Sequence, residues 1–175
     1  MAPLPTVLLL TVAALDLSLS FAHLVEGPPR LWQWSPALWR DATVFNGQFA
    51  LFAPVGGVLE IATILGSAGY AAASRHDRRR LRAALVACTL FALGLVVWLA
   101  VVAPANAVLA TWTPGPLPAD FEVLRTRWEG GHAAIAIVKL AAFAALAFAT
   151  QSGRLTAPAA RTPRSPRGSP GHGPG

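Results

Sequence analysis

The sequence predicts an all-α integral membrane protein, a four-helix bundle with an ordered outer loop region and a disordered C-terminal tail. Of its 175 residues, 54% are hydrophobic and only 13% are charged, and the mean hydropathy is +0.51. Four apolar segments are each long enough to cross a bilayer, which takes about 20 helical residues. Too little polar sequence remains for a second folded domain, so one transmembrane domain is expected over residues 1–150.

The first segment is expected to be a retained helix rather than a cleaved signal, because no Lys or Arg precedes it and its apolar run contains Asp16. The last helix is expected to start near Phe121, after Pro118, and to enter the membrane at Gly131. The four predicted helices are residues 5–25, 45–73, 81–105 and 121–150.

Arginines are distributed unevenly between the two ends of this predicted bundle. Five lie in the loop 74–82 and four more in the tail, whereas the long connections 26–44 and 106–130 hold two each. Because cytoplasmic loops are rich in Lys and Arg, we expect a multi-pass cell-membrane protein with both termini cytoplasmic and the two long loops outside. The formal charge of +6 is therefore expected to meet membrane lipid and not nucleic acid.

Residues 151–175 are rich in Pro, Gly, Ser and Arg. Such a composition cannot bury enough apolar surface to offset the entropy lost on ordering, so a disordered cytoplasmic tail is expected. In the outer loops, five of the six tryptophans suit the headgroup layer. The spacing of Leu31, Trp32, Leu38 and Trp39 also indicates a short interfacial helix, although Pro36 interrupts the pattern.

Three ionisable residues, Asp16, Glu60 and Lys139, lie deep inside apolar segments. A charge at this depth costs about 2.5–3.5 kcal/mol on insertion scales, so such residues face partners or a cavity. We expect the three to meet as a deep polar cluster. Two interpretations stay open: the cluster specifies only how the helices pack, or it handles protons in acid–base chemistry.

A second polar layer is expected nearer the outer side. His23 lies seven residues beyond Asp16, with Glu26 a turn further out, and the offsets four and three place Arg125, Glu129 and His132 on one face of the last helix. Glycines 130 and 131 leave the continuity of that helix in question. The expected upper layer consists of His23, Asn46, Asn106, Glu129 and His132.

Metal binding by this layer is an alternative, since imidazole and carboxylate are common ligands and paired histidines also hold haem. No His-Glu-x-x-His motif supports it, so no metal site is assigned. The single cysteine, Cys88, excludes an internal disulfide and is expected to be a small buried hydrophobe.

One run of residues is more specific. It comprises Asn106, then Trp112-Thr113-Pro114, then Arg125-Thr126-Arg127-Trp128-Glu129-Gly130-Gly131-His132. This order resembles the signature of the anthrone oxygenase-like family, small four-helix membrane proteins many of which are carried only as a domain of unknown function. The segment Ala22-His23-Leu24-Val25-Glu26 and Glu60 also resemble that family, so the similarity spans about residues 5–150 and omits the tail.

The resemblance implies a four-helix bundle and oxidation of a polycyclic anthrone to an anthraquinone by dioxygen, without a metal, a flavin or another cofactor. Such a reaction needs a base, donors that hold an oxyanion, and an apolar pocket. Candidates for the base are His132 and His23. The candidate oxyanion donors are Arg125, Asn106 and Lys139, and Trp112 and Trp128 would wall the substrate.

The candidate centre is therefore Asn106, Arg125, Glu129 and His132, with His23 and Glu26 opposite, Asn46 among the substrate-binding residues, and Asp16, Glu60 and Lys139 beneath. The function expected is that of an oxidoreductase acting on an apolar, anthrone-like or quinone-like molecule. Whether the protein is an enzyme stays open at this point. The alternative is a non-catalytic module that binds a partner protein or lipid and whose buried polar residues only specify packing.

Overall fold

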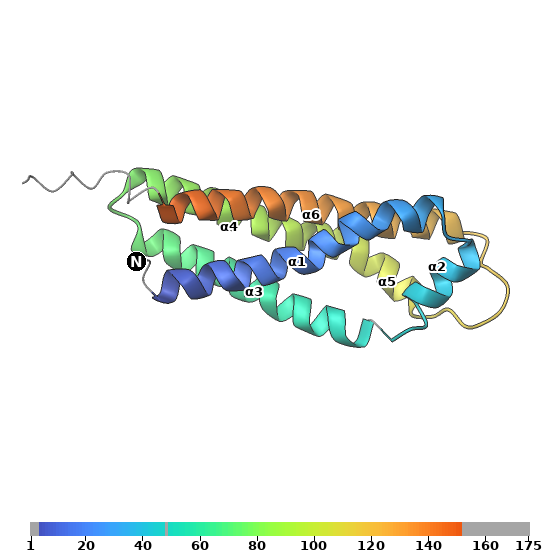
Figure 1. Cartoon of the computed structure of the whole chain (residues 1–175). Coiled ribbons are helices and arrows are strands. Elements are labelled where there is room, and N and C mark those ends of the chain that lie inside the picture. The colour runs from blue at the N-terminus through green and yellow to red at the C-terminus, as the bar shows by residue number, and fades with distance from the viewer. Residues whose placement is uncertain (1–3, 48, 152–175) are drawn as a thin grey trace, which may run out of the picture.

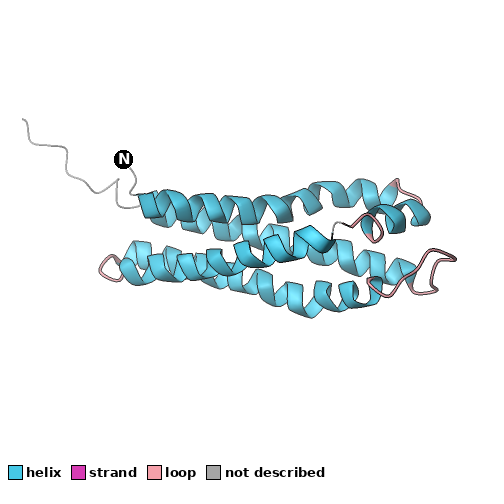
Figure 2. Cartoon of the chain, turned by 90° about the horizontal axis from the view of Figure 1, so that it is seen from below, coloured by secondary structure: helices cyan, strands magenta, loops and turns pink. Residues whose placement is uncertain are grey.

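A computed structural model describes residues 4–47 and 49–151 of the chain. Within these residues the fold is helical and contains no strand (Figure 2). The predicted disordered tail lies outside the described residues, apart from its first residue, Gln151.

Four long helical stretches run side by side as an elongated bundle (Figure 1). They are α1 (Leu4–Trp32), α3 (Phe49–Ala73), α4 (Arg78–Val97) with its continuation, and α6 (Phe121–Gln151). The continuation of α4 is a π-helical turn, η1 (Trp98–Val102), followed by α5 (Ala103–Leu109). In the described part of the chain, these four stretches are long and apolar enough to cross a membrane. The prediction of an all-α, multi-pass membrane bundle is confirmed.

The bundle has two different ends (Figure 1). At the arginine end lie the first turn of α1, the arginine-rich turn between α3 and α4, and the last turn of α6. At the aromatic end lie the short helix α2 (Pro36–Thr43) and the loop 110–120. Helix α2 is the short helix predicted around Trp39, but it starts at Pro36, because Ser35 caps it and proline suits the first helical turn.

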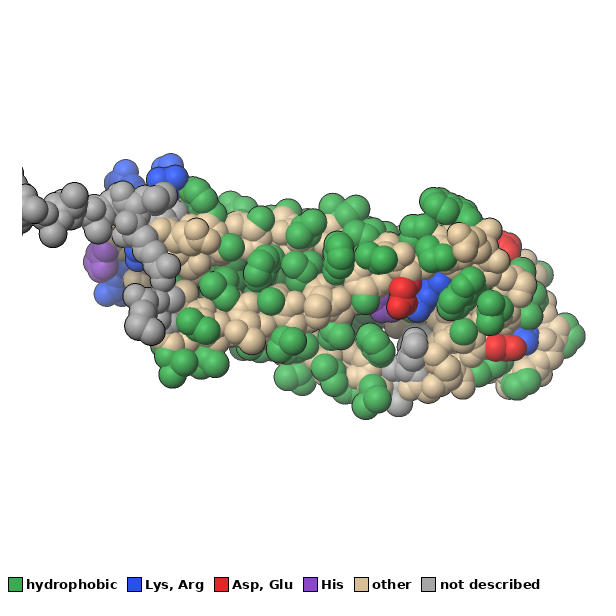
Figure 3. Space-filling model, viewed as in Figure 1, with side chains coloured by type: hydrophobic (Ala, Val, Ile, Leu, Met, Phe, Trp, Pro, Cys, Tyr) green, Lys and Arg blue, Asp and Glu red, His purple; other side chains and the backbone are tan. Residues whose placement is uncertain are grey.

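The outside of the bundle is apolar, as expected for a protein surrounded by lipid (Figure 3). Large side chains such as Leu51, Val58 and Ile137 are well exposed on it. The interior at the arginine end is built instead from small residues, including Ala71, Ala84 and Ala149, which let the helices approach closely. The aromatic end has a larger core around Trp39, Leu109 and Trp128.

The first helix is longer than predicted. It runs to Trp32 instead of ending at residue 25, and it includes Pro28 and Pro29. The side chain of Arg125 explains the extension, because its guanidinium donates to the carbonyls of Arg30 and, at 3.0 Å, Leu31. These carbonyls at the helix end have no partner within the helix, so a charged donor from α6 takes that place.

The third crossing also exceeds its prediction of 81–105. Its start moves to Arg78, because the Asp77 side chain accepts hydrogen bonds from the backbone of Arg79 and Arg80 at the helix N-terminus. Its far end continues through η1 to Leu109. Pro104 has no N–H to offer the carbonyl of Ala100, and the Arg127 side chain donates to that carbonyl at 3.3 Å.

The remaining two predicted helices differ less. Helix α3 begins at Phe49 rather than at residue 45, after a turn in which Gly47 has a positive φ of 78°. Helix α6 matches its prediction and passes without a break through Gly130 and Gly131. The doubt about its continuity is therefore removed.

These two adjacent glycines predict a clear difference in stability. A Cβ on Gly131 would lie 2.8 Å from Val102 and 3.0 Å from Val101, whereas a Cβ on Gly130 would meet nothing within 4 Å. Gly131→Ala should overpack α6 against η1 and cost about 1–3 kcal/mol. Gly130→Ala should be neutral or stabilise by up to about 1 kcal/mol. Thermal unfolding in detergent checks this, and an equal midpoint for both variants would refute the close approach.

Candidate functional site

Three charged side chains from three helices meet in the middle of the bundle. The Nζ atom of Lys139 on α6 lies 2.7 Å from Oδ1 of Asp16 on α1, and it also pairs with Glu60 on α3. All three residues are buried. The structure thus brings together the predicted deep layer as one ion cluster. Its second oxygens, Asp16 Oδ2 and Glu60 Oε1, are buried and have no hydrogen-bond partner in the protein.

A cavity of about 170 Å³ lies on the aromatic-end side of this cluster. The cluster forms its floor, since all three charged residues are among its lining. Its walls come from every long helical stretch of the bundle. The other described residues that line it are Leu19, Ser20, His23, Thr43, Phe52, Ala53, Gly56, Gly57, Leu95, Trp98, Asn106, Trp128, His132 and Ile135.

Two histidines stack above the floor. The rings of His23 and His132 lie 4.1 Å apart at an interplanar angle of 19°. The indole of Trp128 packs against both at steep angles, with centroids 5.2 Å from His23 and 4.4 Å from His132. Phe52 meets His23 edge-on at 6.0 Å. The upper part of the cavity is therefore an aromatic enclosure around two bases.

An amide donor is held at the same level. The Nε1 atom of Trp128 donates to Oδ1 of Asn106 at 2.7 Å. Because indole nitrogen can only donate, this bond fixes the amide orientation and leaves Nδ2 of Asn106 as the group that can donate to a ligand. The π-helical turn η1 begins at Trp98, another residue of the lining, and π-helical turns frequently occur at functional sites.

The cavity opens sideways, between α1 and α3. Helix α3 diverges from α1 towards the aromatic end (Figure 1), and the lining residues Phe52, Ala53 and Gly57 of α3 are exposed. In Figure 3 a hollow on this face shows histidine atoms beside an acidic and a basic side chain. An apolar molecule dissolved in the bilayer could therefore reach the histidines without passing through water.

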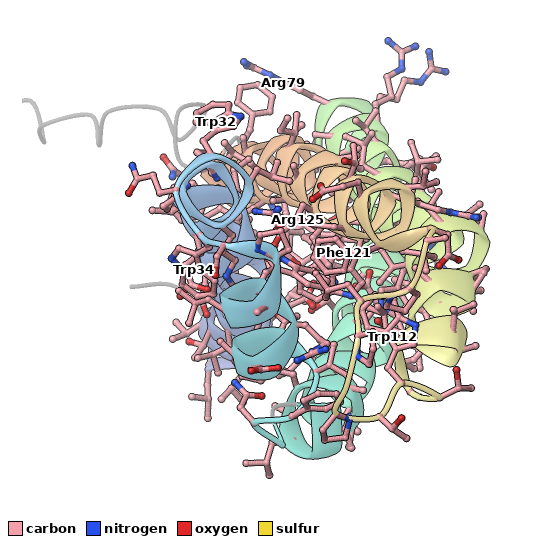
Figure 4. All side chains as sticks on the ribbon, turned by 90° about the vertical axis from the view of Figure 1, so that its right-hand side faces the viewer. Trp32, Trp34, Arg79, Trp112, Phe121 and Arg125 are labelled. Atoms are coloured by element: carbon pink, nitrogen blue, oxygen red, sulfur yellow. The ribbon has the colours of Figure 1, made fainter. Side chains whose placement is uncertain are left out.

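Two predicted residues of the centre, Glu129 and Arg125, form a separate polar unit. The Glu129 carboxylate is buried and accepts a hydrogen bond of 2.7 Å from Nε1 of Trp39, which joins α2 to α6. Arg125 points between the helices, as Figure 4 shows from the aromatic end, and its guanidinium binds the last carbonyls of α1. The expected role of Arg125 as an oxyanion donor has no geometric support, because its donors are engaged outside the cavity lining.

Three predicted substrate-binding residues are placed elsewhere. Asn46 is exposed and donates to the carbonyl of Ala42 in its own segment. Glu26 is exposed and pairs with Arg30, one turn further along α1. Trp112 stacks on Phe121 at 5.9 Å, where it covers the core of the aromatic end. In the part of the chain that the structure describes, none of the three lines the cavity.

Sequence reasoning missed two contributors to the site. Trp39 is fully buried, although its type and position suggested a headgroup anchor like Trp32, which is 79% exposed. Thr43 lines the cavity from the end of α2. The signal for Trp39 was its place in α2 after the Ser35-Pro36 helix start, where it shares one face with Thr43 at a spacing of four.

Over residues 4–47 and 49–151, no group of three or more His, Cys, Asp or Glu side chains is placed to hold a metal ion. Comparison of the chain with known protein families, with curated proteins and with solved structures found no match. The resemblance to the anthrone oxygenase-like family therefore stays a prediction.

The ion cluster predicts a large effect of removing its cation. In Lys139→Met, two buried carboxyl groups would lose their common partner, so the variant should be destabilised by about 3–5 kcal/mol. Arg82→Met removes an exposed cation from α4 and should change stability by less than about 0.5 kcal/mol. Unfolding curves in detergent compare the two, and equal stabilities would mean that the cluster does not hold the helices together.

The bond between Trp39 and Glu129 predicts a second effect. Trp39→Phe keeps an aromatic ring but leaves a buried carboxylate oxygen without its donor, which should cost about 1–3 kcal/mol. Trp32→Phe is the matched control, because that indole is 79% exposed, and it should have no measurable effect. If both variants unfold together with the unmodified protein, the buried hydrogen bond contributes nothing to stability.

Proposed function

We propose that this protein is a cell-membrane oxidoreductase that oxidises a flat, apolar aromatic molecule of the anthrone or hydroquinone class with dioxygen. The observation that carries the proposal is the composition of one cavity. Aromatic walls, two stacked histidines and an ion cluster converge on the same enclosed volume. This combination supplies a hydrophobic pocket with a base, an oxyanion donor and a group that accepts protons.

The size and the opening of the cavity suit such a substrate. An apolar cavity of about 150 Å³ holds a benzene ring, so the 170 Å³ enclosed here accommodates one aromatic ring. The remaining rings or an aliphatic tail would extend through the opening between α1 and α3 into the bilayer. A reactive ring enclosed in this way is kept from water, which strengthens the electrostatic interactions around it.

The reaction can be written for an anthrone. A neutral imidazole of the His23–His132 pair removes a proton from the ring CH₂ group, and the negative charge passes to the ring oxygen. The stacked pair keeps one neutral imidazole, because two adjacent positive rings repel one another. Asn106 Nδ2 and the Lys139 ammonium face the cavity, and they stabilise the oxyanion.

Dioxygen then adds to the deprotonated carbon, and the resulting hydroperoxide loses water to form a second carbonyl. One oxygen atom enters the product and the other leaves as water, so the four electrons that the CH₂ carbon loses reduce one dioxygen. With a hydroquinone the same base removes hydroxyl protons, and two electrons reduce dioxygen to hydrogen peroxide. Neither reaction as written needs a cofactor, which agrees with what the family resemblance implies.

The proposed topology places the arginine end and both termini in the cytoplasm. Its support is the cluster of five arginines in the turn between α3 and α4, at the same end of the bundle as both ends of the described chain. The cavity then lies in the outer half of the membrane, beneath the aromatic end.

Oxygen consumption by the protein in lipid nanodiscs tests the proposed function, with an anthrone and then a hydroquinone as substrate. The rate should exceed that of protein-free nanodiscs, and His132→Ala or His23→Ala should lower it about 100-fold or more, because a general base contributes at least that factor. His76→Ala is the matched control, since His76 is exposed at the arginine end. Retained folding is verified by the unfolding midpoint.

Two results would overturn the proposal. One is the absence of turnover above protein-free nanodiscs with both substrates. The other is turnover that survives in both cavity histidine variants. Either result, together with a large loss of stability in Lys139→Met, would favour the non-catalytic alternative, in which the buried polar residues only specify packing.

A further inference from the structure

Two hydroxyl groups are buried beyond the floor of the cavity, on the side of the arginine end. Thr63 and Ser67 follow Glu60 on α3, and both are 0% exposed. Neither Thr63 Oγ1 nor Ser67 Oγ has a hydrogen-bond partner in the protein. A buried hydroxyl without a partner costs about 1–3 kcal/mol, so two on one helix face need an explanation.

Other hydroxyls of the bundle behave differently. Thr11 donates to the carbonyl of Val7 at 2.9 Å, and Ser18 donates to that of Leu15 at 2.8 Å. Both lie on the exposed surface of α1. Any serine or threonine in a helix can bond to a carbonyl of the preceding turn in this way. Thr63 and Ser67 instead direct their hydroxyls away from their own helix and into the interior.

The two hydroxyls continue a line that starts at the ion cluster. Offsets of three, seven and ten residues place Thr63, Ser67 and Tyr70 on the same face of α3 as Glu60. The line descends by about 1.5 Å per residue, so Ser67 lies roughly 10 Å beyond Glu60. Tyr70 marks its far end, where its hydroxyl lies 3.3 Å from the carbonyl of Ala149 near the end of α6.

Successive members of the line are about one helical turn, or roughly 5 Å, apart. This is too long for a direct hydrogen bond but suits a bridging water, which makes two bonds of about 2.8 Å. Buried waters are typical where polar groups lack protein partners. Glu60 Oε1, which has no partner in the protein, would accept from the first water of the chain.

We propose that Thr63, Ser67 and Tyr70, bridged by water, form a proton path between the ion cluster and the arginine end of the bundle. Each step transfers one proton along a hydrogen bond, and the receiving oxygen releases its other proton to the next group. No other bond forms or breaks. Glu60 receives the proton at the cavity floor, while Lys139 and Asp16 balance the charge. This activity goes beyond the proposed oxidation and does not depend on its substrate.

Proton flux into liposomes tests the path directly. The whole protein is reconstituted into vesicles that contain a pH-sensitive dye, and a potassium gradient with valinomycin drives protons inward. Flux should exceed that of protein-free vesicles, and the double variant Thr63→Val/Ser67→Ala should lose this excess entirely. Thr11→Val/Ser18→Ala makes the same chemical changes on the exposed surface of α1 and should conduct like the unmodified protein.

Two further variants keep the test decisive if the double variant does not fold. Thr63→Ser retains a hydroxyl and should keep the flux, whereas Ser67→Ala alone should lose it. The proposal is overturned if the unmodified protein conducts no faster than protein-free vesicles, or if folded Ser67→Ala conducts normally. Because the assay contains no aromatic substrate, its failure would leave the proposed oxidation standing, and failure of the oxygen assay would leave the proton path standing.

Discussion

The structure depends on one lysine placed between two carboxylates inside an apolar bundle. Lys139 is the only lysine of the chain, and it joins α6 to Asp16 of α1 and to Glu60 of α3. In a low-dielectric interior none of these charges is tolerable alone, so each requires that the other two helices be in place. The cavity lies on one side of this cluster and the buried hydroxyls on the other. The charges therefore fix both the helix arrangement and the place where chemistry can occur.

Much of this arrangement follows from local sequence patterns. The apolar length of each segment determines that it spans the bilayer, and helical spacing alone places Asp16 and His23 on one face of α1 and His132 and Lys139 on one face of α6. Because an ionised group in the membrane must find a partner, the convergence of the deep cluster was predictable without coordinates. The tail and the side of the membrane that each end faces depend on composition rules that the described residues do not test.

What could not be predicted depends on contacts between residues distant in the sequence. The end of α1 is extended by Arg125, which lies 93 residues beyond Trp32. An arginine in a loop region was therefore read as a candidate for the site, when its actual role is to cap a helix. Trp39 is a similar case, because only the folded structure shows that its indole binds Glu129 and not the headgroup layer. Such roles are assigned by geometry in three dimensions, while residue type indicates only the range of possibilities.

The π-helical turn η1 imposes a constraint on chain length between Trp98 and Asn106. A π-turn accommodates one residue more than the α-helical ladder does. Deleting a single residue there would restore regular α-geometry and rotate all that follows by about 100°. Asn106 would then turn away from the indole of Trp128, and its amide would leave the cavity. Related sequences that keep this pair should tolerate substitutions in the segment far better than insertions or deletions.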